Sequence, residues 1–172
     1  MSIFNAYQAR FEAAREEEMS VQDYLDLCKA DRSAYATAAE RMLMAIGEPE
    51  LVDTRLEPRL SRIFSNKVLK IYPAFRDFYG MEEVIEHIVS YFRHAAQGLE
   101  EKKQILYLLG PVGGGKSSLA EKLKTLIEKV PFYAIKGSPV NESPLGLFNA
   151  AEDAHILEDD FGIPRRYLGG IM

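Results

Sequence analysis

Apolar side chains recur at helical spacing within residues 1–47 and predict three helices there. The first apolar stripe ends near residue 14. The second helix opens after Ser20, and Asp23 three positions later is typical of a capping box. Asp31 is a plausible cap for the third helix. The connections are short, which favours helices that pack together in one chain as a subdomain, with binding of a partner subunit as the alternative.

Residues 48–73 carry a weaker pattern, because three prolines interrupt them. Residues 68–72 are compatible with a short strand. This is also the most basic stretch of the chain, with cations at Arg55, Arg59, Arg62, Lys67 and Lys70. The simpler interpretation is that these cations form a solvated face against the acidic helices. The more specific alternative is that they form a surface that binds a partner or a phosphate.

After Gly80 the pattern becomes regular again. An apolar stripe predicts a helix that Gly98 closes. Residues 105–109 form a continuous apolar run, as in a central parallel strand that is buried on both faces. An amphipathic helix and a second expected strand at residues 131–135 follow. The order strand, loop, helix, strand predicts an α/β fold with a parallel sheet. Beyond it we expect a loop over 136–148 and a short helix over 152–161.

The loop between the first expected strand and its helix has the pattern G-x-x-x-x-G-K-[ST]. Its residues are Gly110, Pro111, Val112, Gly113, Gly114, Gly115, Lys116 and Ser117, with Ser118 next in the chain. Glycines let backbone N–H groups curl around phosphates, and a helix N-terminus favours anions. Lysine at the seventh position can reach the β- and γ-phosphates, and the serine can bind Mg²⁺. The loop therefore predicts a site for ATP with Mg²⁺, with Ser117 as the metal ligand.

Composition narrows the class of protein further. The chain has 172 residues, is 47% hydrophobic and carries a net charge of −5, so it can build a core and does not favour nucleic acid as the main partner. The single Cys28 lies on the apolar face of the second expected helix, where a core role is expected. It has no partner for an internal disulfide, and no apolar run is long enough to span a membrane. We therefore expect a cytoplasmic protein.

The segment before the first regular helix of this region, Phe78-Tyr79-Gly80-Met81-Glu82-Glu83, resembles the entry into an AAA+ ATPase module. In such modules this segment lines the adenine pocket. The resemblance implies that Tyr79, Gly80 and Met81 contact the base here. A helix cap with Met81 in the core is the simpler interpretation, and it is compatible with the first.

Several longer strings resemble the bacterial PrkA serine protein kinase family. They are Asp31-Arg32-Ser33-Ala34-Tyr35, Ala39-Glu40-Arg41, residues 59–64, residues 105–118 and residues 162–168. Members of that family join an N-terminal AAA+-like module to a C-terminal part likened to eukaryotic protein kinases. The resemblance implies that this chain is a truncated fragment. It would hold an N-terminal helical region and basic linker (1–73) and part of an AAA+-like nucleotide-binding domain (74–172).

The resemblance implies an ATP-binding module of a serine/threonine protein kinase, acting on a protein substrate, with a homo-oligomer as a possibility. An alternative is a regulatory or AAA+ ATPase module that acts on protein partners without phosphoryl transfer. Catalytic residues are not identified. The candidate for a second, magnesium-holding acid is Glu158-Asp159-Asp160, in which Asp159 lies 43 residues after Lys116. Only two apolar residues precede these acids, so a short surface helix is favoured.

Overall fold

The computed structural model describes residues 3, 4, 7, 18–64 and 66–168. These residues cluster into two compact units, one drawn from 1–34 and 142–172 and the other from 35–141. Each unit buries apolar side chains of its own. Most of the first expected helix lies outside the described residues. None of the described helices combines the length and apolarity needed to cross a bilayer.

The first unit packs α2 (Val21–Ala30) against α7 (Ala154–Phe161). The expected capping box is confirmed at the start of α2, where the backbone N–H of Asp23 donates to Ser20 Oγ at 3.1 Å. Cys28 is 3% exposed, so its expected core position is also confirmed. Burial raises the pKa of the Cys28 thiol, because desolvation disfavours the thiolate. Short 3-10 turns, η5 (Pro144–Leu147) and η6 (Arg165–Tyr167), complete this unit.

The prediction that Asp31 caps the third helix is wrong. Asp31 instead caps the 3-10 turn η1 (Arg32–Tyr35), because its carboxylate accepts the backbone N–H two residues on, at 2.8 Å. The helix α3 (Ala38–Ile46) has its own capping box, formed by Thr37 and Glu40. The extended backbone of Thr37 separates the two elements, so one predicted helix becomes a turn and a shorter helix.

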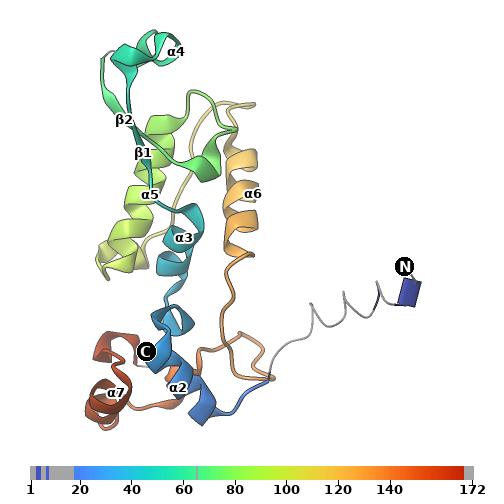
Figure 1. Ribbon diagram of the computed structural model, residues 1–172, viewed down its shortest axis with the longest axis vertical. Helices are drawn as coiled ribbons and strands as arrows, with labels where there is room; N and C mark the ends of the chain where they lie inside the picture. The colour runs from blue at the N-terminus through green and yellow to red at the C-terminus, as the bar shows by residue number, and fades with distance from the viewer. Residues whose placement is uncertain (1–2, 5–6, 8–17, 65, 169–172) are drawn as a thin grey trace. The chain divides into compact units, whose positions relative to one another are not determined.

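The second unit is built around three helices, α3, α5 (Glu82–Ala96) and α6 (Lys116–Ile127), which lie side by side in Figure 1. Met42 and Ile46 of α3 are buried in the same cluster as the apolar faces of α5 and α6. The third N-terminal helix thus packs with the helix that follows the glycine loop, whereas α2 packs in the other unit. The described helices α2 and α3 thus fall in different compact units, and the expected domain boundary at residues 73 and 74 stays a prediction.

The sheet that the described residues form is a two-stranded antiparallel hairpin. β1 (Glu50–Asp53) pairs with β2 (Val68–Ile71), with Val52 opposite Leu69. The sequence predicted β2 but not β1, since β1 is only four residues long and follows a proline. The segment between the strands holds η2 (Thr54–Leu56) and α4 (Pro58–Ser61), and β2 leads into the turn η3 (Pro73–Phe75).

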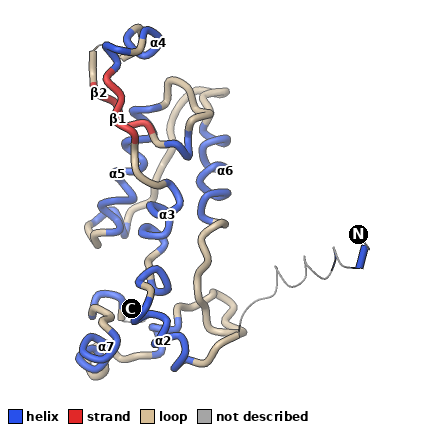
Figure 2. Tube along the Cα trace, in the orientation of Figure 1, coloured by secondary structure: helices blue, strands red, loops and turns tan. Residues whose placement is uncertain are grey.

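The expected parallel sheet is not present among the described residues. Residues 105–109 and 131–135 lack strand pairing and are drawn as loops in Figure 2. Leu106 and Leu108 pack against the helical core, while Ile105, Tyr107 and Leu109 are 90%, 79% and 84% exposed. A strand needs a neighbour to pair its backbone N–H and C=O groups, and no described segment offers these residues one. The turn η4 (Glu100–Lys103) connects α5 to this segment.

Candidate phosphate-binding site

The first turn of α6 has no side-chain cap. Its N-cap is Gly115, which has no side chain to satisfy the free backbone N–H groups of the first turn. Leu119 is 1% exposed and anchors this end of the helix in the core of the unit. The helix therefore presents fixed, unsatisfied N–H donors and a positive dipole end to the glycine loop.

Three consecutive glycines shape the loop for different reasons. Gly113 and Gly115 adopt φ angles of +78° and +74°, a left-handed region that residues with a Cβ rarely occupy. At Gly114 a Cβ would lie 3.1 Å from the carbonyl oxygen of Pro111, which is tight against rigid backbone. The backbone conformation thus requires glycine at these positions, and the three glycines add no side chain to the loop.

Lys116 folds back over this loop. Its Nζ donates to the carbonyl oxygens of Gly110 at 2.8 Å and Pro111 at 2.6 Å. The ammonium is therefore held at the loop by neutral acceptors and has no carboxylate as its partner in these bonds. An anion entering the loop would offer a stronger acceptor than a carbonyl, since charge-assisted hydrogen bonds are the stronger kind.

A pocket of about 320 Å³ adjoins the loop. Met81, Val84, His87 and Ile88 line one side of it, and Gly110, Gly114 and Lys116 contribute from the loop and α6. The sulfur of Met81 is so close to the loop that a Cβ on Gly115 would lie 3.2 Å from it. Val84 and Ile88 were not expected at the site, but they follow Met81 at helical spacing, which is the signal that identifies them.

The other expected base-contacting residues lie differently. Tyr79 is 87% exposed and does not line the pocket, and Gly80 forms a turn before α5 with φ of +76°. Ser117 and Ser118 are exposed on the first turn of α6. The described residues contain no cluster of three or more His, Cys, Asp or Glu side chains suited to a metal ion. The role of Ser117 as a magnesium ligand stays a prediction.

The acids proposed as a second magnesium-holding group lie on α7. Glu158, Asp159 and Asp160 are all exposed on this helix, which confirms the short surface helix. They belong to the first compact unit, while the glycine loop belongs to the second.

A glycine loop that leads directly into an uncapped helix, with lysine at the first helical position, defines the phosphate-binding loop of P-loop proteins. Residues 19–172 match the family model of the PrkA AAA domain, and the chain belongs to this family. The family assignment confirms an AAA-type domain, although the described sheet has only the two antiparallel strands.

Two curated relatives illustrate the similarity. The chain is 66% identical over its whole length to the serine/threonine kinase YeaG of Escherichia coli K12, of which it covers 27%. Over 88% of its length it is 36% identical to the ATP-dependent protease PrkA of Bacillus subtilis 168, of which it covers 24%. The chain thus spans about a quarter of the length of these relatives. No solved structure matches it.

Proposed function

We propose that this chain binds ATP with Mg²⁺ and that the loop from Gly110 to Ser118 holds the phosphates. The observation that carries the proposal is the ammonium of Lys116, which hydrogen-bonds two carbonyls of the glycine loop beside the uncapped start of α6. Triphosphate oxygens would replace the carbonyls of Gly110 and Pro111 as acceptors for this ammonium. Mg²⁺, bound with the nucleotide, would take the Ser117 hydroxyl as a ligand.

The same proposal places the adenine next to Met81. The pocket beside the loop is large enough for a planar base and is bordered by the apolar side chains of Met81, Val84 and Ile88. Gly80 allows the sharp turn that brings Met81 to Gly115. Tyr79 would have to turn inward to contact the base, so we expect it to contribute less to base binding than Met81 does.

The two relatives' names suggest different uses of ATP. One is named a kinase and the other an ATP-dependent protease, and both activities act on protein. We propose that the longer protein is an ATP-dependent serine/threonine protein kinase that works in the cytoplasm as a homo-oligomer. The alternative, an AAA+ ATPase that acts on proteins without phosphorylating them, is favoured by the protease name.

The longer protein distinguishes these activities. Incubation with radiolabelled ATP and a denatured protein substrate should label the substrate on serine or threonine without cleaving it. ATP-dependent cleavage without labelling would instead establish the alternative. A Lys116→Ala variant of the same protein should lose whichever activity is found, because both need bound ATP.

In the longer protein we further propose that residues 105–109 form a strand of a parallel sheet. Burial alternates along this segment, because Leu106 and Leu108 pack on the helices whereas Ile105, Tyr107 and Leu109 are exposed. Neighbouring strands would cover those side chains and pair the backbone. Amide hydrogen exchange at these residues should be fast in this chain and slow in the longer protein.

The chain by itself is expected to hydrolyse ATP very slowly and to phosphorylate no protein. The acids of α7 are exposed on a short surface helix and not at the end of a buried strand, where a carboxylate could be held in position to orient a water molecule. Phosphate release measured with saturating ATP and Mg²⁺ checks this. Turnover of about 1 per second or more that disappears in Asp159→Asn would contradict it.

Two glycine substitutions distinguish a loss of stability caused by backbone strain from a loss of ATP binding at the loop. Gly115→Ala and Gly137→Ala both put a Cβ at positive φ, so each should lower stability by about 1–3 kcal/mol. Gly137 has open space around it, whereas Gly115 abuts Met81 at the loop. ATP titration should show weaker binding for Gly115→Ala alone, and equal affinities for the two variants would argue against the loop as the phosphate site.

A further inference from the structure

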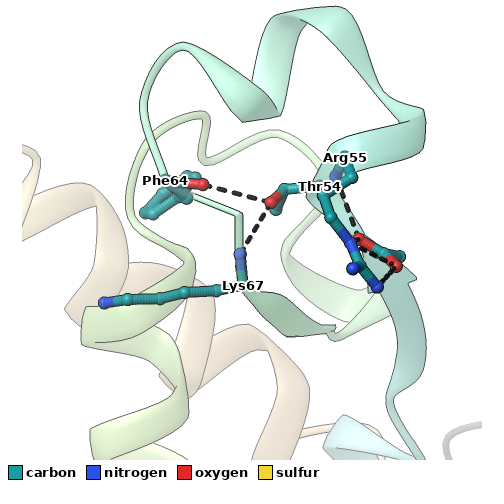
Figure 3. Close-up of polar contacts among 5 residues, drawn as sticks. Thr54, Arg55, Phe64 and Lys67 are labelled. Carbon is teal, nitrogen blue, oxygen red and sulfur yellow. Dashed lines mark hydrogen bonds and ion pairs between the residues drawn. The ribbon is translucent and has the colours of Figure 1, made fainter.

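The segment that joins β1 to β2, described over residues 54–64 and 66–67, forms a hairpin tip whose base is closed by hydrogen bonds. Thr54 is fully buried, its hydroxyl donates to the carbonyl of Phe64 at 3.1 Å and accepts the backbone N–H of Lys67 at 2.9 Å (Figure 3). The backbone N–H of Thr54 also donates to the carbonyl of Lys67 at 3.0 Å. Figure 1 shows α4 at the end of the hairpin. The tip therefore presents its outer side chains from a fixed frame.

Two of the four cations on the tip are already paired. Arg55 bonds the carboxylate of Asp53, with a shortest contact of 2.6 Å, and Lys67 bonds Glu83 of α5 at 2.9 Å. These hydrogen bonds from Arg55 hold the pKa of Asp53 below its usual value. Arg59 and Arg62 are exposed and form no ion pair within the part of the chain that the structure describes.

The free cations lie next to exposed apolar side chains. Arg59, Arg62 and Ile63 are three and four residues apart on the helical turn of α4 and its continuation, so they share one side of it. Ile63 is 61% exposed and Leu56, just before α4, is 81% exposed. Pairing of Leu51 with Lys70 and of Asp53 with Val68 puts Leu51 and Val68 on one face of the hairpin, where they are 70% and 61% exposed. The hairpin and its tip thus expose both apolar side chains and arginines without an ion pair, a combination that is typical of protein interfaces.

We propose that the hairpin tip is a docking surface for a segment of another protein that carries both carboxylate and apolar side chains. We expect the partner segment to be acidic, because the tip has four basic residues and one acidic residue. The rest of the chain is acidic enough to give a net charge of −5. The arginines would bind carboxylates, and Leu56 and Ile63 would contact the partner's apolar side chains. Nucleic acid fits less well, since only two cations are uncommitted and affinity for a phosphate backbone grows with the number of phosphates neutralised.

The test uses the whole chain and three defined probes measured by fluorescence anisotropy. The first is a labelled helical peptide with Leu on one face and Glu on the other, and the second has Gln in place of Glu. The third is a single-stranded oligonucleotide of the same charge as the Glu peptide. We expect the Glu peptide to bind at least about tenfold more tightly than the Gln peptide, and more tightly than the oligonucleotide. Added salt should weaken this binding.

Variants then locate the binding. Arg59→Glu/Arg62→Glu should lose at least about tenfold in affinity for the Glu peptide, whereas the matched control Lys102→Glu/Lys103→Glu, with the same change of charge at exposed positions, should bind like the original chain. Leu56→Ser/Ile63→Ser keeps the charges and should also weaken binding. Circular dichroism confirms that each variant folds.

Four results would overturn the proposal. They are equal affinity for the Glu and Gln peptides, tighter binding of the oligonucleotide, an equal loss in the lysine control, and unchanged binding by the arginine variant. Sedimentation adds a fifth, because self-association that only the arginine variant abolishes would make a second copy the occupant of the tip.

Discussion

Replacing Lys116 by alanine is expected to weaken ATP–Mg²⁺ binding by about 10- to 100-fold, the cost of a charged hydrogen bond to phosphate. Among the described residues, its ammonium bonds the carbonyls of Gly110 and Pro111, which are neutral acceptors and weaker than phosphate oxygens. Isothermal titration of the original chain and the variant with ATP and Mg²⁺ measures the difference.

A second lysine on the same helix provides the control. Lys124 is exposed near the end of α6, away from the loop, so Lys124→Ala should bind ATP like the original chain. Thermal unfolding should differ little among the three proteins, because both lysines lie outside the core cluster. Equal ATP affinities for the original chain and both lysine variants would contradict the assignment of this loop as the phosphate-binding site.

Replacing Ile46 by alanine is expected to lower the free energy of unfolding by about 2–5 kcal/mol. Ile46 is 3% exposed and packs in the cluster that also holds Leu119 of α6. The comparison is Met44→Ala on the same helix, where the side chain is 52% exposed and the expected loss is small. Urea unfolding followed by circular dichroism measures both variants.

This comparison tests whether α3 belongs to the unit that carries the phosphate loop. Similar, small losses for Ile46→Ala and Met44→Ala would mean that α3 does not support that core. If α3 does support it, deletion of residues 1–47 removes Met42 and Ile46 together and should destabilise the remainder by more than either single substitution.

The sequence predicted those elements whose signal is local. The apolar stripes of α5 and α6, the capping box at Ser20 and the short helix α7 all appear, because helical spacing and caps depend on neighbours in the chain. The cap of α3 was misplaced, since Asp31 and Thr37 both have side chains that can cap a helix. Capping preference in the sequence does not by itself show which of these two residues is the N-cap of α3.

Elements that depend on distant partners were harder to predict. Residues 105–109 have the composition of a buried strand, but pairing needs a second strand that the described residues do not offer. Leu51 and Val52 of β1 form a strand through pairing with β2, which no pattern in four residues reveals. The division of the N-terminal helices between two units likewise depends on which apolar faces meet, and not on where the helices end.

The candidate site was predictable to the extent that it is a contiguous string. The glycine positions of the loop follow from the motif, and the structure gives each a backbone reason at Gly113, Gly114 and Gly115. Met81, named from resemblance, lies beside the loop, since a Cβ on Gly115 would be 3.2 Å from its sulfur, and its contact with a base stays a prediction. The location of a second acid was not predictable, because such a residue is defined by its position beside the loop in space.

Backbone amide shifts during an ATP–Mg²⁺ titration test the central claim most directly. Two-dimensional ¹⁵N NMR spectra of the chain should show the largest changes at the amides of residues 113–117, with smaller changes at Met81. That pattern would place the phosphates at the loop and the start of α6. Absence of changes at residues 113–117 at saturating nucleotide, or changes confined to another part of the chain, would contradict the account.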